Sequence, residues 1–301
     1  MTDRPTAGVD IGGTKIKAAV VTPDGAVLAS ATAPTPPGGA AMLDVAAELV
    51  ARATASAGVP VAAVGVGAAG VVDPVTGEVL AASDTFVDWV GTDLSAGLAA
   101  RTGLPVTVAN DVDSFLVGEA TWGAVRGARS AAGIALGTGV GGALWLDGAL
   151  YRGAGAAGEI GHMPGFGDAR CTCGQRGHLE TLASGRSVER RYAEVLGGAG
   201  PETVGAAEIE SRARTGDEVA VRVLADAGRA VGSAVLVLAA LLDVGHVVVG
   251  GGLARAWDLL EPAIRGRLDD EPPVSGHRIE VRQAVLGGDA TVIGAAALAR
   301  P

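Results

Sequence analysis

The chain has 301 residues, of which 49% are hydrophobic, 19% charged and only 3% aromatic. This length is typical of two lobes that bury enough apolar surface to fold alone, and two cysteines cannot build a disulfide scaffold. The 33 acidic side chains outnumber the 23 basic ones and give a net charge of −10, so we expect no binding of nucleic acid.

The first third of the chain predicts three strands followed by alternating helices and strands. The strands are expected at 7–11, 15–22 and 26–31, and the Asp24-Gly25 turn between the last two is typical of a hairpin. The apolar pattern then predicts, in order, a helix at 40–57, a strand at 61–67, a helix at 94–102, a strand at 106–109 and a helix from Asn110-Asp111 to Trp122.

A second copy of the opening pattern follows in the middle of the chain. Residues 132–153 repeat the order strand, Gly-Thr turn, strand, Asp-Gly turn and strand. This repeat predicts a duplicated lobe, and two facing lobes would form a cleft suited to small ligands. The first lobe is expected at 1–117, with a C-terminal helix at 288–301 that returns to it, and the second at 118–287.

The last third of the chain predicts a helix at 217–242 and then a buried strand at 247–249. The strand runs into the glycine turn Gly250-Gly251-Gly252, and a helix is expected from about Ala254. A strand, a glycine turn and a helix in this order place backbone N–H groups at a helix N-terminus, which suits a nucleotide.

Two features bear on location. The longest strongly apolar run, 231–242, is too short to cross a bilayer. Residues 1–5 lack the apolar centre of a signal peptide. We therefore expect a cytoplasmic protein that makes no membrane contact.

Two glycine-rich loops each follow a predicted strand. The first is Asp10-Ile11-Gly12-Gly13-Thr14-Lys15, and the second is Gly137-Thr138-Gly139. Glycines let backbone N–H groups approach phosphate oxygens, while threonine adds a hydroxyl and lysine a charge. An aspartate at a strand end can hold hydrated Mg²⁺. The spacing matches neither the P-loop nor the dinucleotide fingerprint, but two such loops and a third glycine turn together predict a phosphate site.

Both cysteines and half of the four histidines lie in one glycine-rich loop at 161–180. All of these side chains are good zinc ligands, and a closed set of four is typical of structural zinc. We therefore expect about one structural Zn²⁺ per chain, and the alternative is a surface loop with incidental cysteines. The four expected ligands are His162, Cys171, Cys173 and His178.

Several carboxylates stand beside these motifs. Asn110-Asp111 lies at a strand-to-helix junction, where the pair can either cap the helix or supply a general base, and the sequence alone favours the cap. Glu159 and Glu180 flank the Cys/His loop, so a bound zinc would bring them into one small region. Paired carboxylates bind vicinal hydroxyls well, although an exposed glutamate is more often only a solvated charge.

Taken together, these motifs resemble those of the ROK family of bacterial sugar kinases and repressors. They span nearly the whole chain in the family's order, which makes the resemblance specific. The motifs are Asp-Ile-Gly-Gly-Thr-Lys at 10–15, Asn110-Asp111, Leu-Gly-Thr-Gly-Val-Gly-Gly at 136–142, Gly-Glu-Ile-Gly-His at 158–162, Cys-x-Cys-Gly-x-x-Gly at 171–177 and Glu180.

The resemblance implies an α/β, two-lobed hexokinase/actin-like (ribonuclease H-like) fold that uses ATP and Mg²⁺ to phosphorylate a hexose at its 6-hydroxyl. By position, Asp111 would be the general base. The sugar contacts that it implies are Gly70, Asn110, Asp111, Glu159, His162 and Glu180. The phosphate and Mg²⁺ contacts are Asp10, Gly12, Gly13, Thr14, Gly137, Thr138 and Gly139, with the adenosine end at Gly250, Gly251 and Gly252.

The chain departs from the family pattern at three positions. His178 stands where the fourth zinc ligand is usually cysteine, so we expect a His₂Cys₂ site. No asparagine precedes Trp89, so one sugar contact is either missing or supplied by Asp84. Asp113 stands where an asparagine is common, with no consequence that we can derive.

The family leaves several functions open. Glucose is the first expectation, and N-acetylmannosamine or N-acetylglucosamine kinase is the alternative, because specificity depends on which substrate groups find partners. A non-catalytic sugar-sensing regulator is a further alternative, but it would not need Asp111. A DNA-binding repressor is not expected, because Asp10 begins the first loop and leaves no room for a preceding helix-turn-helix. A homodimer is expected from the family alone.

Overall fold

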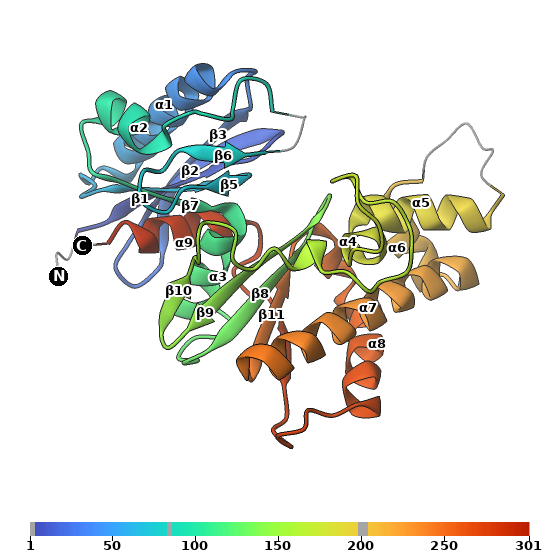
Figure 1. Cartoon of the computed structure of the whole chain (residues 1–301). Helices are drawn as coiled ribbons and strands as arrows, with labels where there is room; N and C mark the ends of the chain where they lie inside the picture. The colour runs from blue at the N-terminus through green and yellow to red at the C-terminus, as the bar shows by residue number, and fades with distance from the viewer. Residues whose placement is uncertain (1–3, 83–85, 198–203, 301) are drawn as a thin grey trace. The chain divides into compact units, whose positions relative to one another are not determined.

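The structure is a computed structural model, which describes residues 4–82, 86–197 and 204–300. The chain divides into two compact units (Figure 1). Unit 1 comprises 1–129, 143–157 and 284–301, and unit 2 comprises 130–142 and 158–283. The lobe boundaries inferred from the sequence lie at 117/118 and 287/288. They stay a prediction, because the two compact units do not show where one copy of a duplicated lobe ends and the next begins.

Unit 1 is built on a five-stranded sheet with the order β3-β2-β1-β4-β7. The first three strands form an antiparallel meander, and β4 and β7 run parallel to β1. The strands are β1 (Thr6–Ile11), β2 (Lys15–Val21), β3 (Val27–Pro34), β4 (Val64–Ala68) and β7 (Val106–Asn110). A short hairpin of β5 (Val71–Val72) and β6 (Val79–Ala81) follows β4.

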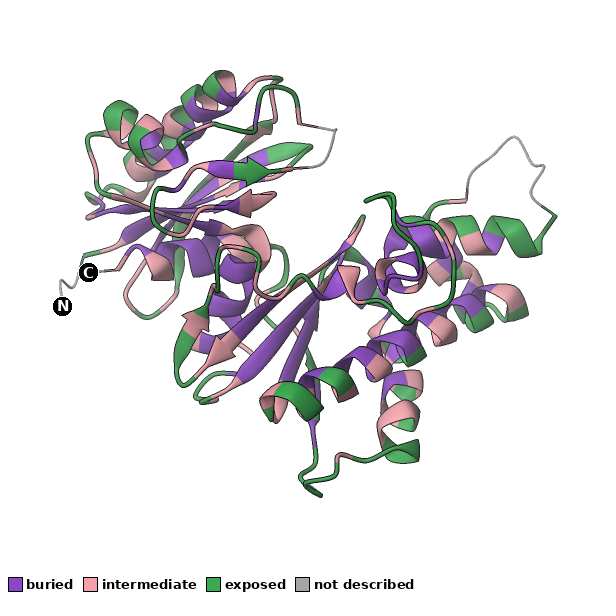
Figure 2. Ribbon diagram, viewed as in Figure 1, coloured by how far each residue is buried: buried purple, intermediate pink, exposed green. Residues whose placement is uncertain are grey.

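The central strands β1, β2 and β4 of this sheet are mostly buried, whereas β3 at its edge is half-buried or exposed (Figure 2). Side chains alternate along β2, so Ile16, Ala18 and Val20 belong to the larger core cluster, while Ala19 and Val21 belong to a second cluster on the opposite face. The larger cluster is completed by α1 (Gly39–Ala57) and α2 (Leu94–Thr102), and the second by α9 (Ala290–Leu298). The helix α3 (Asp111–Thr121) packs against α9.

Glycines let α9 lie directly on the strands and on α3. A Cβ at Gly8 would stand 1.8 Å from the Val292 carbonyl oxygen, and one at Gly65 would stand 1.7 Å from the Ala295 oxygen. On the helix itself, a Cβ at Gly294 would stand 1.7 Å from a backbone oxygen of α3. The C-terminal helix therefore fits unit 1 only because these positions carry no side chain.

A buried carboxylate fixes the segment that leads into α9. Glu119, near the end of α3, is fully buried and accepts hydrogen bonds from three backbone N–H groups. The donors are Ala124 at 2.7 Å, Val285 at 3.0 Å and Leu286 at 2.9 Å. These bonds replace the water that the carboxylate loses on burial, so the chain enters α9 along one defined path.

The second sheet has the order β10-β9-β8-β11-β12, which repeats that of the first sheet. The pair β9–β10 is antiparallel, and β11 runs parallel to both β8 and β12. The predicted duplication is therefore confirmed at the level of topology. The strands are β8 (Ala131–Leu136), β9 (Val140–Leu146), β10 (Ala149–Tyr151), β11 (His246–Gly250) and β12 (Glu280–Gln283).

The helices of unit 2 follow the Cys/His loop and the strand β11. They are α4 (Glu180–Ala183), α5 (Gly185–Val195), α6 (Ala206–Arg214), α7 (Glu218–Leu242) and α8 (Trp257–Asp270). Unit 2 also has two 3₁₀ helices, η1 (Ile160–His162) and η2 (Gly252–Ala256), in its described residues. A third, η3 (Gly287–Asp289), lies in unit 1.

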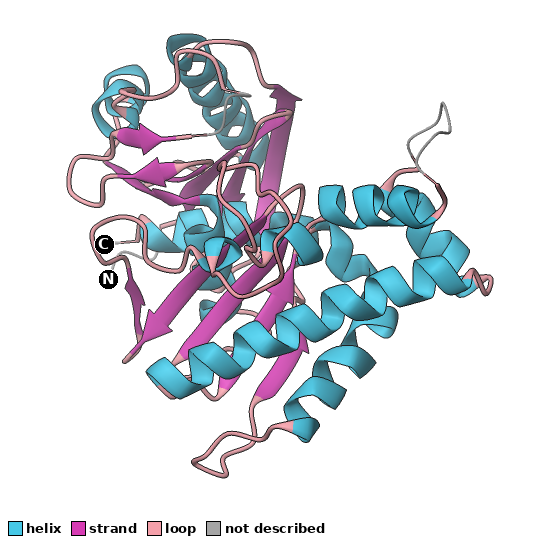
Figure 3. Cartoon of the chain, turned by 45° about the vertical axis from the view of Figure 1, so that its right-hand side comes forward, coloured by secondary structure: helices cyan, strands magenta, loops and turns pink. Residues whose placement is uncertain are grey.

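The long helix α7, prominent in Figure 3, is apolar enough by length and composition to span a membrane. More than half of that apolar stretch is buried inside the protein. Two glycines of α7 let α8 pack closely against it. A Cβ at Gly228 would stand 2.7 Å from the Leu260 oxygen, and one at Gly232 would stand 2.8 Å from the Arg267 Cβ. These contacts are those of a helix in the core of a folded unit.

The close approach of α9 gives a stability prediction. We expect Gly65→Ala to lower the thermal unfolding midpoint by about 5–10 °C, because its Cβ would overlap a backbone oxygen that cannot move freely. The matched control is Gly266→Ala in α8, where no atom lies within 4 Å of the added Cβ and alanine favours the helix. Equal midpoints for the two variants in differential scanning calorimetry would contradict this packing.

Candidate active site

Three strand ends meet at one edge of the sheet in unit 1. The parallel register pairs Asp10 with Gly67, and it pairs Ala68 with both Ile11 and Asn110. Because β1, β4 and β7 run in the same direction, their carboxyl ends open at the same edge. The structure therefore brings together Asp10, the turn at Gly70 and the Asn110-Asp111 pair, all of which the sequence predicted as site residues.

The first glycine loop joins β1 to β2 at this edge. Gly12 donates its N–H to the Lys15 oxygen at 3.2 Å, which closes the turn. Thr35, just after β3, donates its hydroxyl to the Gly12 oxygen at 2.6 Å and its N–H to the Thr14 oxygen at 3.1 Å. Gly13, Thr14 and Lys15 are exposed. Thr35 thus fixes the backbone of the loop through two hydrogen bonds. No motif in the sequence predicts this role.

Asn110 caps α3, as the sequence favoured. Its Oδ1 accepts hydrogen bonds from the N–H groups of Val112 at 2.7 Å and Asp113 at 3.4 Å. Its Nδ2 donates to the Gly70 oxygen at 2.9 Å, so the same side chain fixes the turn after β4. Gly70 has a φ of 104°, and a Cβ there would stand 2.4 Å from the Ala81 oxygen. Only glycine fits this turn.

Asp10 and Asp111 are electrostatically coupled. Asp111 is the first residue of α3, and its Oδ1 accepts the Val112 N–H at 2.9 Å. Burial and, second to it, the negative charge of Asp111 raise the pKa of Asp10 to about 7, although Lys15 and Lys17 lower it. A cation beside Asp10 would stabilise its ionised form, because a positive charge offsets both the burial of the carboxylate and the negative charge of Asp111.

An aromatic pair lies beside the first loop. Phe86 stacks on the buried Trp89 with ring centroids 5.7 Å apart, and the Trp89 indole N–H donates to the Ala69 oxygen at 2.9 Å. A Cβ at Gly13 would lie 3.5 Å from the Phe86 ring. The predicted substitute for the missing asparagine, Asp84, lies outside the described residues.

The second glycine loop joins β8 to β9 in unit 2. Gly137 donates its N–H to the Gly139 oxygen at 2.9 Å, and Gly185 donates to the Gly137 oxygen at 2.8 Å. Thr138, between these glycines, is exposed, and Gly139 is half-buried. The N-terminus of α5, which the sequence did not predict, therefore fixes this loop.

The third glycine turn lies at the end of β11, beside the end of β8. Gly250 pairs with Ala135, and a Cβ at Gly251 would stand 2.5 Å from the Leu136 oxygen. Gly252 begins η2, and α8 follows at Trp257, so the regular helix begins three residues later than predicted. The two glycine turns of unit 2 are thus neighbours.

The four predicted zinc ligands come together in unit 2. Their ligand atoms all lie within 4.8 Å of one another. The two histidine Nδ1 atoms are 3.3 Å apart, Cys171 Sγ is 3.8 Å from His162 Nδ1, and Cys173 Sγ is 3.4 Å from His178 Nδ1. A tetrahedral zinc with ordinary Zn–N and Zn–S bonds requires separations of about 3.3–3.8 Å between its ligands. The cluster therefore fits a zinc ion.

Glu159 and Glu180 flank this cluster. Glu159 precedes η1, and its Oε2 lies 3.9 Å from His162 Nε2. Glu180 begins α4, where its Oε2 accepts the Val140 N–H at 3.1 Å and its Oε1 accepts the Thr172 hydroxyl at 2.8 Å. Thr172 carries no signal in the sequence that would have identified it.

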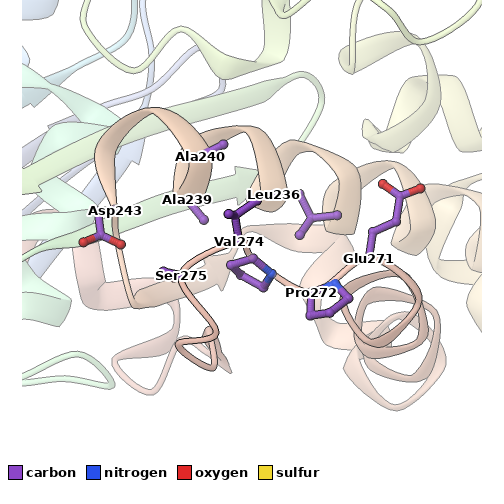
Figure 4. Close-up of a pocket in the computed structure, with 9 residues that line it drawn as sticks. Leu236, Ala239, Ala240, Asp243, Glu271, Pro272, Val274 and Ser275 are labelled. Atoms are coloured by element: carbon purple, nitrogen blue, oxygen red, sulfur yellow. The ribbon is translucent and has the colours of Figure 1, made fainter.

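A separate pocket of about 460 Å³ lies between the C-terminal part of α7 and the segment that follows α8. Figure 4 shows the carboxylates of Asp243 and Glu271 at its two ends, with apolar side chains between them. None of the predicted site residues lines it. We therefore do not assign this pocket to the site described above.

Comparisons with known proteins give matches in both sequence and structure. The model of the ROK family matches residues 6–301. A glucokinase of Streptomyces coelicolor is 38% identical over 312 aligned residues, which cover 98% of this chain and 97% of the relative.

Two solved structures are also similar. A ROK family glucokinase from Streptomyces griseus, in complex with glucose and AMPPNP, is 36% identical with a TM-score of 0.85 and covers 98% of this chain and 99% of that one. A ROK hexokinase from Thermus thermophilus is 34% identical with a TM-score of 0.83 and covers 98% and 97%. The predicted fold class is confirmed.

The Cys/His cluster gives a prediction for metal content. We expect the purified protein to carry about one zinc per chain by elemental analysis, and Cys173→Ser to lose most of it, because a serine oxygen is a poor replacement for thiolate. His277→Asn, a histidine outside the cluster, is the control and should leave the zinc content unchanged. Active wild-type protein without zinc would contradict the assignment.

The Asp10 carboxyl gives a prediction for pH dependence. Its pKa of about 7 in the folded protein lies above its ordinary value near 3.8, so folding favours the protonated form and Asp10 destabilises the fold increasingly between about pH 4 and 7. Above pH 7 the effect is constant. Asp10→Asn removes this titration, so the variant's gain in thermal midpoint over the wild type should be larger at pH 8 than at pH 5.

The measurement is thermal unfolding without added Mg²⁺ or nucleotide, with exposed Asp269→Asn as the control. A gain for Asp10→Asn that is the same at both pH values would show that Asp10 is not perturbed in the folded protein.

Proposed function

The chain belongs to the ROK family, and from this premise we propose that it catalyses ATP-dependent phosphorylation of a hexose at the 6-hydroxyl, with glucose as the preferred sugar. The observation that carries the proposal is the carboxyl edge of unit 1, where Asp10, the first glycine loop and Asp111 converge. Such an edge offers a phosphate cradle and a general base side by side. The similarity to glucokinases supports glucose.

Asp111 is the proposed general base. As the sugar 6-oxygen attacks the γ-phosphorus, its proton passes to the Asp111 carboxylate, while the bond from the γ-phosphorus to the β-phosphate oxygen breaks and ADP leaves. Asn110 supports this step, since its cap fixes the first turn of α3 and so the direction of the next side chain. Its Nδ2, bonded to the Gly70 oxygen, also fixes the turn that is proposed to contact the sugar.

The glycine loops are the proposed phosphate contacts. Gly12, Gly13, Thr14 and Lys15 present backbone N–H groups, a hydroxyl and a cation at one edge, and Gly137, Thr138 and Gly139 do so from unit 2. Asp10 would hold Mg²⁺, which when bound neutralises charge on the β- and γ-phosphates. The turn at Gly250, Gly251 and Gly252 is the proposed contact for the adenosine end.

The Cys/His loop is the proposed sugar clamp. Zinc held by His162, Cys171, Cys173 and His178 would act as a structural crosslink, because four protein ligands leave no open position. His162 can serve both metal and sugar: its Nδ1 faces the cluster, and its Nε2 is on the side of Glu159. Glu159 and Glu180 would present acceptors for sugar hydroxyls, and His162, with Nδ1 on the metal, would present its Nε2–H as a donor to a sugar oxygen.

The remaining expectations rest on the family. We propose a cytoplasmic enzyme that forms a homodimer and acts on free sugar and ATP without nucleic acid. Kinases for N-acetylmannosamine or N-acetylglucosamine and a non-catalytic sugar sensor remain the alternatives that a substrate panel would detect. For the sensor, the expected result is sugar binding without release of ADP.

The direct test is an ADP-release assay with ATP across glucose, mannose, N-acetylmannosamine and N-acetylglucosamine. We expect the highest kcat/KM with glucose, and we expect Asp111→Asn to lower kcat by a factor of about 10³ while glucose binding by calorimetry persists. The control is Asp269→Asn, an exposed aspartate on α8, with unchanged kcat.

Three outcomes would count against the proposal. Higher kcat/KM with an N-acetylated sugar would overturn glucose as the substrate, and unchanged kcat in Asp111→Asn would remove the base. No ADP release with any sugar would overturn the kinase itself.

A further inference from the structure

The Glu180 carboxylate is held between two loops that belong to different parts of the proposed site. Its Oε2 accepts the Val140 N–H at 3.1 Å, at the end of the second glycine loop. Its Oε1 accepts the Thr172 hydroxyl at 2.8 Å, from the residue between the two cluster cysteines. A glutamate side chain is otherwise free to adopt many rotamers, so these two bonds select one of them.

The position of Thr172 is itself fixed by its neighbours. Cys171 donates its N–H to the Gln175 oxygen at 2.8 Å, and Gly174 donates to the Cys171 oxygen at 3.0 Å, so residues 171–175 form a closed turn. The cysteines on both sides of Thr172 point their sulfurs into the Cys/His cluster. Thr172 is therefore presented to Glu180 by a turn that the cluster anchors at two points.

The opposite side of the carboxylate is equally confined. A Cβ at Gly139 would stand 2.4 Å from Glu180 Oε2, so the glycine loop approaches the carboxylate as closely as a bare backbone allows. An ionised carboxylate can accept about four hydrogen bonds. Oε1 also accepts a bond from the Cys171 thiol at 3.7 Å, which a zinc-bound thiolate would not donate. With zinc bound, one acceptor site on each oxygen would therefore remain for the hydroxyls of a sugar.

We propose that Thr172 is a positioning residue for Glu180, and that its hydroxyl sets the orientation in which this carboxylate receives the sugar. The inference rests on the proposed function, in which Glu180 contacts the sugar, and it assigns a role to a residue that no metal or sugar motif includes. Thr172 acts on sugar affinity rather than on phosphoryl transfer, because in the described part of the chain the donors to the carboxylate of its partner Glu180 are Val140, Thr172 and Cys171, and none of these is the proposed base.

The test compares Thr172→Val, which keeps the side-chain shape and removes the hydroxyl, with Thr172→Ser, which keeps the hydroxyl. We expect Thr172→Val to raise the KM for glucose and the calorimetric Kd for glucose about tenfold, with kcat and the KM for ATP within twofold of the wild type. Thr172→Ser should restore most of the affinity. Thr215→Val, which removes an exposed threonine hydroxyl that donates to the Arg212 oxygen at 2.9 Å, is the matched control and should change none of these values.

A double-mutant cycle with Glu180→Gln tests whether Thr172 acts through Glu180. If it does, adding Thr172→Val to Glu180→Gln should raise the glucose Kd less than twofold further. Zinc content by elemental analysis should stay at the wild-type value in both Thr172 variants, which separates positioning from loss of the metal.

Failure of the role proposed for Thr172 can be distinguished from failure of the proposed kinase function. Active wild-type enzyme with an unchanged glucose KM in Thr172→Val, equal impairment of the valine and serine variants, or loss of zinc in Thr172→Val would each overturn the role of Thr172 and leave the kinase intact. Wild-type protein that neither binds glucose nor releases ADP with any hexose would overturn the proposed function, and the role of Thr172 with it.

Discussion

The constraint on which the site depends is the parallel direction of β1, β4 and β7. Because three strands end at one edge, residues that are far apart in the sequence, Asp10 and Asp111, come close enough for the charge of one to raise the pKa of the other. Neither carboxylate is unusual alone. Two hydrogen-bonded features complete this edge: the glycine loop that Thr35 holds and the helix cap that Asn110 forms. Together these groups are chemically able to bind phosphate, hold a cation and accept a hydroxyl proton.

In unit 2, the carboxylate beside the glycine loop is held in a different way. The second sheet repeats the strand order of the first, but the carboxylate beside its glycine loop comes from α4 and bonds a residue of the loop that carries the Cys/His cluster. A metal crosslink suits this segment, since a glycine-rich loop with few apolar residues has little hydrophobic burial to fix it. With zinc bound, the rigidity of the proposed sugar clamp would thus come from coordination rather than from packing.

Much of this could be predicted from the sequence. The hairpin at Asp24-Gly25, the Asn110 cap and the four clustered ligands each follow from local chemistry, so the sequence places them within a few residues. The hairpin β5–β6 has strands too short for a periodic signal, and α6 is polar with few buried apolar residues. The helix α5 does have an apolar face, with Val188 and Tyr192 at helical spacing, so it could have been predicted from the sequence. Thr35 escaped prediction because its partner Gly12 lies in a separate segment of the chain. Thr172 bonds the nearby Glu180, but a single threonine carries no pattern that would predict the bond.

The central claim is that the carboxylate of residue 111 receives the proton of the sugar's 6-hydroxyl. The most direct measurement is a crystal structure of the protein with glucose and a non-hydrolysable ATP analogue. We expect the 6-oxygen to lie within about 2.6–3.2 Å of the Asp111 carboxylate and to face the γ-phosphate. Glucose bound with its 6-hydroxyl out of reach of Asp111, or another hydroxyl in that position, would contradict it.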